Sequence, residues 1–287
     1  MTKTMSAAAD EIDIRKDVVY ATHDGVALAG DFYLPKGAGP FPALVGVHGG
    51  GWRLGARSSF QYWGPYLAAR GYALFAVSYR LASKGKSTYP QAVNDVCAAV
   101  QFVRGEAKTF NVDAERIALM GASAGAHLSG LASLAGETFA KAYPQDRHAS
   151  VSPKVKALIG IYGVYDMAAN WFDFQRQTPA ENPTDMFIGC TPMHDRRRYF
   201  EASPISYTTF ANNHVAVFLS WGTEDDLVDR AQQSEAFQLA LKRAGFFVRT
   251  AVVQAAPHYW VSDPIDEPGS FSGFVAPRLV RFLAERL

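Results

Sequence analysis

The stretch Gly121-Ala122-Ser123-Ala124-Gly125 matches the pattern G-x-S-x-G, and its position in the chain gives the match its meaning. Residues 116–120, directly before it, form an apolar run with the length of a buried strand, and the residues after it are rich in helix formers. The serine therefore stands where a strand is expected to turn sharply into a helix. The flanking glycines lack the Cβ atoms that would clash in such a turn. The stretch predicts Ser123 as a nucleophile.

Strand-like and helix-like runs alternate along the rest of the chain. Two β-rich runs, 18–21 and 26–34, flank Asp24-Gly25, which is a strong hairpin signal. Further strands are expected at 43–47, 72–79, 116–120, 155–162, 215–221 and 246–254, and helices at 60–70, 90–108, 126–135, 230–244 and 271–287, with Pro277 favouring a break or a late start in the last. This order predicts an α/β protein whose mostly parallel sheet carries helices on both faces.

One segment, 164–214, interrupts the alternation and is rich in aromatic residues. A loop of that length without secondary structure is uncommon in a compact domain. A crossover helix near 195–201 with packed aromatic side chains would explain it, and so would an inserted lid that lines a substrate pocket, the interpretation we favour. The predicted organisation is an N-terminal extension at 1–16 and one domain at 17–287, with the lid at 164–214.

Composition restricts the classes of function. Of the 287 residues, 48% are hydrophobic and 19% charged, and the net charge of +1 offers no argument for nucleic acid or an anionic membrane as a partner. No apolar run approaches the ~18–20 residues that span a bilayer, and the N-terminus lacks the pattern of a secretion signal. Two cysteines, Cys97 and Cys190, cannot build a disulfide framework, so reduced thiols and a cytoplasmic location are expected.

A serine hydroxyl needs a neighbouring base to take its proton, and the base needs an orienting acid. In a sheet of this kind, the acid and then the histidine are expected after the serine, in loops at the carboxyl ends of later strands. Among the seven histidines, His258 meets this condition because it follows the last predicted strand. His23 and His48 precede the serine, and His127 lies in the helix that follows it, where packing or a hydrogen bond is the plainer role.

The acid is harder to choose, because the loop at 221–229 offers several carboxylates. Asp225 follows the turn glycine of this loop closely and has an apolar pair behind it, so it is our prediction. Asp226 is its nearest rival, and Asp229 could instead cap a helix. Asp166, after the preceding strand, is an outside candidate.

An ester or amide carbonyl develops negative charge on its oxygen during attack, and rigid backbone N–H groups stabilise that charge best. His48-Gly49-Gly50-Gly51-Trp52 directly follows a buried strand and would present such groups without Cβ obstruction. The N–H of Ala124 should complete the set, at the start of a helix whose dipole favours negative charge. A plain glycine-rich turn or a phosphate loop is the alternative, but neither a P-loop lysine nor G-x-G-x-x-G follows.

From about Phe32 onward, these features resemble the α/β-hydrolase superfamily. The chain is most similar to carboxylesterases of the hormone-sensitive-lipase type and to their small esterase and feruloyl-esterase relatives. The motifs that carry the resemblance are Val47-His48-Gly49-Gly50-Gly51-Trp52, Ser78-Tyr79-Arg80-Leu81, Tyr89-Pro90-Gln91-Ala92-Val93-Asn94-Asp95, the Ser123 stretch, Ser203-Pro204-Ile205 and the Asp225 loop. The resemblance implies an eight-stranded α/β-hydrolase sheet. It also implies a Ser123, Asp225 and His258 triad, with Gly50, Gly51 and Ala124 (or Gly49 in place of one) as oxyanion donors.

Two departures concern the pocket. Relatives commonly have His-Gly where this chain has Trp221-Gly222, so an aromatic residue there is expected to shape the pocket. The N-terminal extension is short beside the helical cap of hormone-sensitive-lipase relatives, so any lid must come from the segment after Tyr162. We predict that Trp52, Trp221 and Tyr259 contact the substrate.

The function that the resemblance implies is a serine carboxylesterase. It would act on small apolar or aryl esters through an acyl-enzyme and would use no metal or organic cofactor. Arylformamidases share the His-Gly-Gly-x-Trp motif and a run like 123–128, so formamide or amide hydrolysis is the nearest alternative. A non-catalytic ligand-binding protein on the same scaffold is a remote one. The sequence leaves open whether the chain forms a homodimer.

Overall fold

The structure, a computed structural model, describes residues 12–287 and is built around one eight-stranded sheet. The strands are β1 (Ile12–His23), β2 (Val26–Pro35), β3 (Phe41–Val47), β4 (Ala73–Val77), β5 (Val112–Ala122), β6 (Ala157–Ile161), β7 (Ala216–Gly222) and β8 (Val248–Val253). They lie in the order β1-β2-β4-β3-β5-β6-β7-β8. β1 and β2 pair antiparallel, as do β2 and β4, and the remaining pairs are parallel. The predicted fold class is confirmed.

The first hairpin forms where Asp24-Gly25 predicts it, but its first strand begins earlier than expected. β1 already includes residues 12–16, which belong to the predicted N-terminal extension. These residues are mostly exposed at the edge of the sheet, so they carry little of the apolar signal by which strands are recognised. The rest of that predicted extension, residues 1–11, lies outside the described part of the chain.

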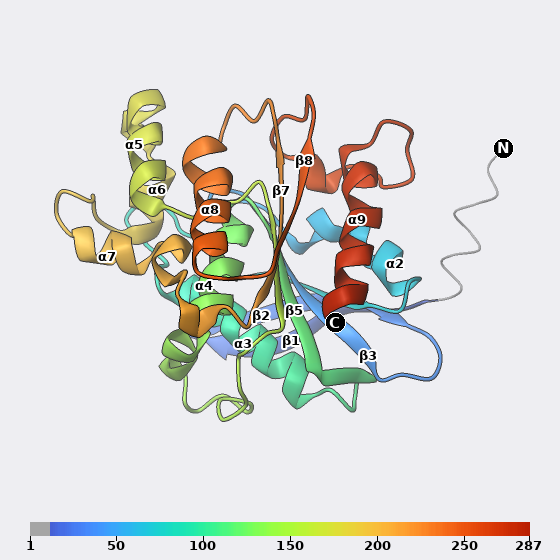
Figure 1. Cartoon of the computed structure of the whole chain (residues 1–287). Coiled ribbons are helices and arrows are strands. Elements are labelled where there is room, and N and C mark those ends of the chain that lie inside the picture. The colour runs from blue at the N-terminus through green and yellow to red at the C-terminus, as the bar shows by residue number, and fades with distance from the viewer. Residues whose placement is uncertain (1–11) are drawn as a thin grey trace.

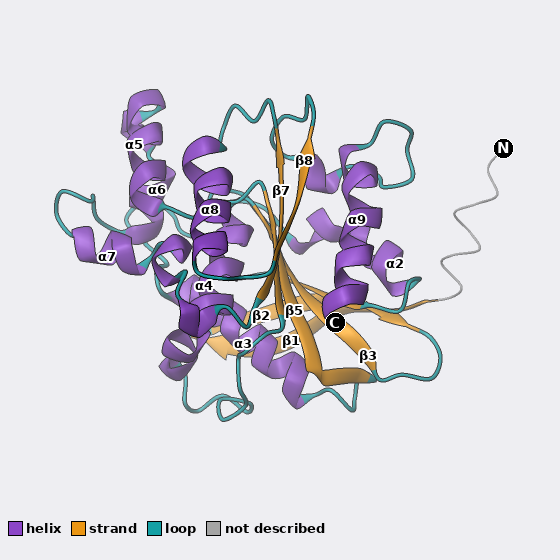
Figure 2. Ribbon diagram, viewed as in Figure 1, coloured by secondary structure: helices purple, strands orange, loops and turns teal. Residues whose placement is uncertain are grey.

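Helices cover both faces of the sheet (Figures 1 and 2). One face carries α3 (Gln91–Gly105), α4 (Ala124–Phe139) and α8 (Ala236–Arg243), and the other carries α2 (Trp63–Ala68) and α9 (Phe271–Arg286). The helix expected at 60–70 is divided into a 3₁₀ turn (Arg57–Phe60) and α2, and Gly71 ends it with a positive φ of 83°. Within residues 12–287, no helix has the length and apolar character needed to cross a membrane.

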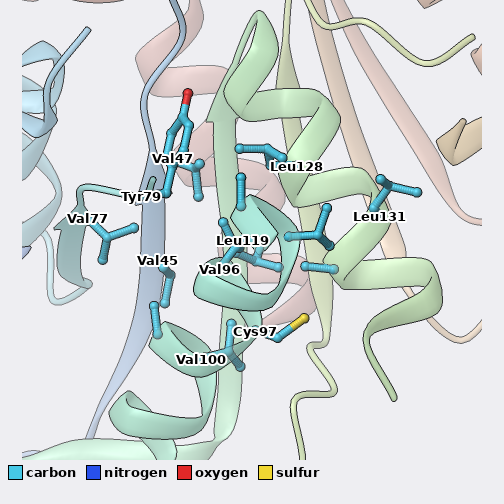
Figure 3. Close-up of a cluster of buried hydrophobic side chains, with 14 of the residues drawn as sticks. Val45, Val47, Val77, Tyr79, Val96, Cys97, Val100, Leu119, Leu128 and Leu131 are labelled. Carbon is cyan, nitrogen blue, oxygen red and sulfur yellow. The ribbon is translucent and has the colours of Figure 1, made fainter. Parts of the chain in front are cut away.

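The central strands are buried on both faces, as their continuous apolar runs predict. Successive side chains of a strand point to opposite faces, so β3 sends Val45 and Val47 toward α3 and α4 and Leu44 toward the other layer. Figure 3 shows the first of these layers, in which side chains of α3 and α4 close over β3 and β5. Burial raises the pKa of the Cys97 thiol in this layer to about 12, so it is an inert packing group.

Pro277 does not break the last helix, contrary to the expectation of a break or a late start. α9 begins at Phe271, where the side chain of Ser270 accepts a hydrogen bond from the N–H of Gly273, and continues to Arg286. Proline removes one helical hydrogen bond. Pro277 is exposed, however, and the opposite face of the helix, including Leu279 and Leu283, is fully buried against the sheet. Tertiary packing of that face therefore outweighs the local cost.

The segment 164–214 folds into three α-helices joined by turns and short 3₁₀ segments. They are α5 (Met167–Gln177), α6 (Pro183–Ile188) and α7 (Arg196–Glu201). Asp166 caps the N-terminus of α5, and Asn182 caps that of α6. The segment lies to the left of α8 in Figure 1. Its helices α5 and α6 lie toward the top of the molecule in that view, the end at which the loops after β7 and β8 emerge from the sheet. α7 falls where the sequence predicts a crossover helix.

Candidate active site

Ser123 occupies a strained turn between β5 and α4. Its backbone φ is 54° and ψ is −122°, a conformation that non-glycine residues rarely adopt. A Cβ atom on Gly121 would lie 2.2 Å from the carbonyl oxygen of Gly125, and one on Gly125 would lie 2.0 Å from that of Val47. The two glycines are therefore required by close backbone contact, as the sequence predicts. The turn is fixed by a hydrogen bond of 2.9 Å from the Ser123 N–H to the Ile161 carbonyl oxygen.

His258 and Asp225 form a hydrogen-bonded chain with this serine. The Nε2 atom of His258 lies 3.0 Å from Ser123 Oγ, and its Nδ1 atom lies 2.7 Å from Oδ2 of Asp225. A carboxylate only accepts hydrogen bonds, so Nδ1 carries the hydrogen and Nε2 is free to accept from the serine hydroxyl. The side chains of His258 and Asp225 are 1% and 2% exposed, which keeps water from competing for these contacts.

Asp225 is held in place by its own loop. Its second oxygen, Oδ1, accepts hydrogen bonds from the N–H groups of Leu227 and Val228 at 3.1 and 2.9 Å. The rival carboxylates have other roles or positions. Asp229 accepts from the N–H groups of Ala231 and Gln232 and so caps the π-helical turn (Ala231–Glu235) that precedes α8, as the alternative interpretation allowed, and Asp166 caps α5. Asp226 is exposed.

The loop that follows β3 passes directly beside the serine. A Cβ atom on Gly49 would lie 2.9 Å from the Ala122 carbonyl oxygen and 3.1 Å from Ser123 Cβ. Gly50 and Gly51 both have positive φ, 116° and 57°, and a Cβ on Gly50 would lie 2.2 Å from the Leu54 carbonyl oxygen. This glycine run therefore permits a backbone path that no other residue type follows without strain.

The three residues predicted to supply oxyanion donors line one cavity together with Ser123. Within residues 12–287, the N–H groups of Gly50, Gly51 and Ala124 donate no hydrogen bond, although all three residues line the same cavity as Ser123. Ala124 is the first residue of α4, so its N–H also lies at the positive end of the helix dipole. Unpaired donors beside a nucleophile can bind an oxygen that gains negative charge.

His48 and His127 have structural roles, which the sequence analysis expects for His127. His48 donates through Nδ1 to the Gly49 carbonyl oxygen at 2.7 Å and stacks on Tyr79, whose hydroxyl donates to the His48 carbonyl oxygen. His127 accepts through Nδ1 from the indole N–H of Trp52 at 3.0 Å, and its Nε2 lies 2.7 Å from the carbonyl oxygen of Ala202. Burial lowers the pKa of both, to about 4 for His127, so each is a neutral group that holds the glycine loop in place.

A cavity of about 400 Å³ opens in front of Ser123, and its walls are mostly apolar. The residues around it are Gly49, Gly50, Gly51, Trp52, Arg53, Leu54, Gly55, Ser59, Ala122, Ser123, Ala124, Tyr162, Val164, Asn170, Phe174, Pro183, Leu227, Val228, Tyr259, Val261 and Ser262. Asn170 and Phe174 belong to α5 and Pro183 to α6, so the segment 164–214 supplies part of the wall. The sequence suggests this through the aromatic residues of the segment but does not single out Asn170 or Pro183.

The three aromatic residues predicted to contact substrate have different positions. Tyr259 lines the cavity and is 63% exposed, and Trp52 lines it from a buried position. Trp221 does not line it. Its side chain is buried in a core cluster with Leu219 and Phe237, because alternation along β7 turns it into the layer under α8. The prediction for Trp221 is therefore not supported by its position.

Comparison with protein families gives one match that covers most of the chain. The BD-FAE family model matches residues 30–241, which include the glycine loop, the serine turn and the Asp225 loop but not His258.

Curated relatives are similar over parts of their length. The chain is 31% identical over 218 residues to esterase LipQ of Mycobacterium tuberculosis, a match that covers 71% of this chain and 46% of the relative. It is 33% identical over 158 residues to the probable isoprenylcysteine alpha-carbonyl methylesterase ICMEL2 of Arabidopsis thaliana. That match covers 54% of this chain and 35% of the relative. An ethyl acetate hydrolase of Pseudomonas putida is 28% identical over 270 residues, with 88% and 78% covered. The chain thus spans less than half the length of the first two.

Solved structures show the same fold. Esterase 2 of Thermogutta terrifontis, phosphonylated by cyclosarin, superposes with a TM-score of 0.73 and 23% identity over 96% of this chain and 94% of that one. A truncated carbohydrate esterase from gut microbiota superposes with a TM-score of 0.76 and 20% identity. That match covers 96% of this chain and 97% of the esterase. With the eight-stranded sheet and the matched motifs, these comparisons establish that the chain belongs to the BD-FAE family, within the α/β-hydrolase superfamily.

Proposed function

We propose that this protein is a serine carboxylesterase that hydrolyses small apolar or aryl carboxylic esters through an acyl-enzyme. The observation that carries the proposal is the hydrogen-bonded chain from Asp225 through His258 to Ser123, which ends in a cavity whose wall presents unpaired N–H groups. The ester hydrolases among the similar proteins support the same class of reaction.

In the first half of the reaction, His258 Nε2 takes the hydroxyl proton of Ser123 as Oγ attacks the ester carbonyl carbon. The carbonyl oxygen becomes negatively charged and accepts hydrogen bonds from the N–H groups of Gly50, Gly51 and Ala124. When the tetrahedral intermediate collapses, His258 gives its proton to the leaving alkoxide, so an alcohol departs and the acyl group remains on Ser123. Asp225 stabilises the imidazolium that exists between these proton transfers.

In the second half, water replaces the alcohol. His258 takes a proton from water as the hydroxide oxygen attacks the acyl carbon, and the same donors stabilise the second oxyanion. Collapse of that intermediate returns the proton to Ser123 Oγ and releases the carboxylic acid. Neither half needs a redox step, and the reaction consumes the ester and one water.

We also propose that the segment 164–214 is the lid over this site. Its helices α5 and α6 contribute Asn170, Phe174 and Pro183 to the cavity wall. Phe174 and Pro183 are apolar, so they favour a substrate with an apolar or aryl part that is buried against them.

The test is hydrolysis of 4-nitrophenyl acetate by the wild-type protein and by Ser123→Ala. The variant removes the nucleophile and leaves the fold, so we expect kcat to fall by roughly 10⁴-fold or more. Full retention of ester hydrolysis by Ser123→Ala would contradict the mechanism. A panel that adds N-formylkynurenine and methyl ferulate separates the ester from the formamide reaction, because the same triad could serve both.

A further inference from the structure

Arg53 is the one residue with a formal charge among the residues of 12–287 that line the active-site cavity. It follows the glycine loop directly in the chain. Its Nε atom lies 4.0 Å from the position that a Cβ of Gly51 would take, so its side chain runs beside the predicted oxyanion donors. Its neighbours in the wall include Leu54 and Pro183, which are apolar. A single cation thus stands in an otherwise uncharged pocket.

The guanidinium of Arg53 has no close hydrogen-bond acceptor in the described part of the chain. Its nearest ionic partner is Glu181, before α6, at an Nη1–Oε distance of 3.8 Å, which is too long for a hydrogen bond. The Glu181 side chain is 74% exposed and that of Arg53 is 34% exposed. Exposed ion pairs of this kind contribute little to stability. Within residues 12–287, no hydrogen bond is donated by the guanidinium of Arg53, although its planar fork has several N–H donors.

The field of Arg53 reaches other groups of the cavity. The pKa of Tyr259 is raised mainly by burial, and the charges of Asp225 and Asp226 raise it further, whereas the charge of Arg53 opposes them. An anion that entered the cavity would be repelled near Asp225 and Asp226 and attracted near Arg53. The apolar wall strengthens that attraction, because charges interact more strongly where water is excluded.

We propose that Arg53 binds an anionic group of the substrate, and that this enzyme prefers esters that carry a carboxylate. The inference rests on the proposed esterase function and specifies the substrate class of the same site. A carboxylate matches the planar fork of arginine with two parallel hydrogen bonds, and in binding it takes the place of the loosely held Glu181. The rest of the substrate is then held by the apolar wall.

The experiment compares kcat/KM for two pairs of esters, after subtraction of spontaneous hydrolysis. On the acyl side, 4-nitrophenyl hemiglutarate is compared with neutral 4-nitrophenyl butyrate. On the alcohol side, 4-acetoxybenzoate is compared with methyl 4-acetoxybenzoate. We expect Arg53→Gln to lower the anionic-to-neutral ratio about tenfold in one of the pairs, mainly through KM, and the affected pair identifies which side of the ester carries the carboxylate. Arg53→Lys keeps the charge without the fork and should retain part of the ratio.

A second variant acts in the opposite direction. Glu181→Gln removes the competing carboxylate, so the anionic-to-neutral ratio should rise about twofold or more in the same pair. The matched control for Arg53→Gln is Arg197→Gln, which makes the same change in net charge. Arg197 pairs with Glu201 on the surface and does not line the cavity, so the ratio should not change.

Equal ratios for the wild-type protein, Arg53→Gln and Glu181→Gln in both pairs would overturn this inference while leaving the esterase proposal intact. An equal loss in Arg53→Gln and Arg197→Gln would also overturn it, because net charge alone would then explain the effect. A wild-type protein that hydrolyses none of the four esters contradicts the esterase function itself, and this inference falls with it.

Discussion

The carboxylate of Asp225 determines which ring nitrogen of His258 carries a hydrogen. Both of its oxygens are used, one by His258 and the other by the N–H groups of Leu227 and Val228. The second contact prevents the carboxylate from rotating, so the imidazole keeps Nε2 directed at Ser123. The orientation of His258, the proposed base, is thus provided by a loop that is itself hydrogen-bonded.

Asp225→Asn tests this role. The loop N–H groups hold one side-chain oxygen, so the new amide would present its NH₂ to His258 and stabilise the tautomer with hydrogen on Nε2, which cannot accept the serine proton. We expect kcat for 4-nitrophenyl acetate to fall by roughly three to four orders of magnitude with little change in stability. Asp226→Asn is the matched control, because Asp226 is exposed, and its activity should stay near that of the wild type. Equal losses in the two variants would contradict the assignment of the acid.

Single residues differ in how far the sequence predicts their place. Ser123 and His258 could be predicted because their positions relative to strands follow from topology. Asp225 required a choice within a cluster of carboxylates, and a one-residue difference in a loop leaves almost no trace in a sequence. The position of Trp221 does not support the predicted substrate contact, because the direction of a side chain depends on strand register, which the pattern alone does not fix at the end of a strand. The position of Arg53 in the cavity wall could not be predicted, because nothing in the sequence shows that its nearest carboxylate, that of Glu181, lies too far away for a hydrogen bond.

The glycine loop after β3 is the element whose shape the proposed chemistry depends on most. It is held from two sides, by His48 on Tyr79 and by the Trp52 indole on His127. Trp52 also stacks on Phe187 of α6, with ring centroids 4.9 Å apart, and His127 is hydrogen-bonded to Ala202 after α7. The segment 164–214, the glycine loop and the helix that follows Ser123 therefore share one buried junction.

Gly50→Ala should damage catalysis through the shape of this loop. The added methyl group meets the Leu54 carbonyl oxygen at a φ of 116°, so the backbone must move and carry the N–H donors with it. We expect kcat to fall about 100-fold or more, the effect of losing an oxyanion donor. Gly37→Ala is a matched control, because Gly37 has nearly the same φ, 117°, but no neighbouring atom within 4 Å.

The two glycine variants are compared by thermal unfolding and by kcat. Both should lose some stability from the strained φ, whereas only Gly50→Ala should lose activity. Wild-type kcat in Gly50→Ala would show that the loop does not provide oxyanion donors.

Most elements were predictable because strands and helices of this sheet carry clear apolar periodicity. The exceptions have physical reasons. The start of β1 lies at a polar edge, and α9 continues through Pro277 because its buried face holds it against the sheet. Not all helices of the segment 164–214 could be predicted from the sequence. α5 and α6 are short, and they depend on caps and on tertiary contacts such as the hydrogen bond from the Trp171 indole to Asp185.

At the scale of the whole molecule, two buried histidines make stability depend on pH in opposite directions. His23 lies between Asp95 and Asp146, each 2.7 Å from a ring nitrogen, and its pKa is raised: burial lowers it, and the two carboxylates more than compensate. Its contribution is complete below its unfolded pKa of about 6.5 and is lost as pH rises through the higher folded value. His127 behaves in the reverse way, because burial depresses its pKa to about 4.

His127 should therefore destabilise the fold in mild acid. Between pH 6.5 and 4 the unfolded chain binds a proton that the folded chain does not, so the free energy of unfolding falls as pH falls. The shift corresponds to a loss of up to about 3 kcal/mol over that range. The contribution of His23 is constant there, because its folded and unfolded forms are both protonated below its unfolded pKa, while His48, whose pKa is also lowered, adds to the loss.

The check is urea denaturation of the wild-type protein and His127→Gln across pH 4.5 to 7. Glutamine can accept from Trp52 and donate to Ala202 without titrating, so the variant should show a shallower decline of the unfolding free energy toward acid pH. Parallel declines in the two proteins would mean that His127 is not the group responsible.

The central claim is that Ser123 is a nucleophile activated by His258. The most direct measurement is labelling with paraoxon followed by peptide mass spectrometry, since the reagent phosphorylates an activated serine and reports the residue that reacted. We predict one diethyl phosphate per chain on the peptide that contains Ser123, and no label in Ser123→Ala. A wild-type protein that hydrolyses esters while Ser123 stays unlabelled, or a label on another residue, would contradict the account.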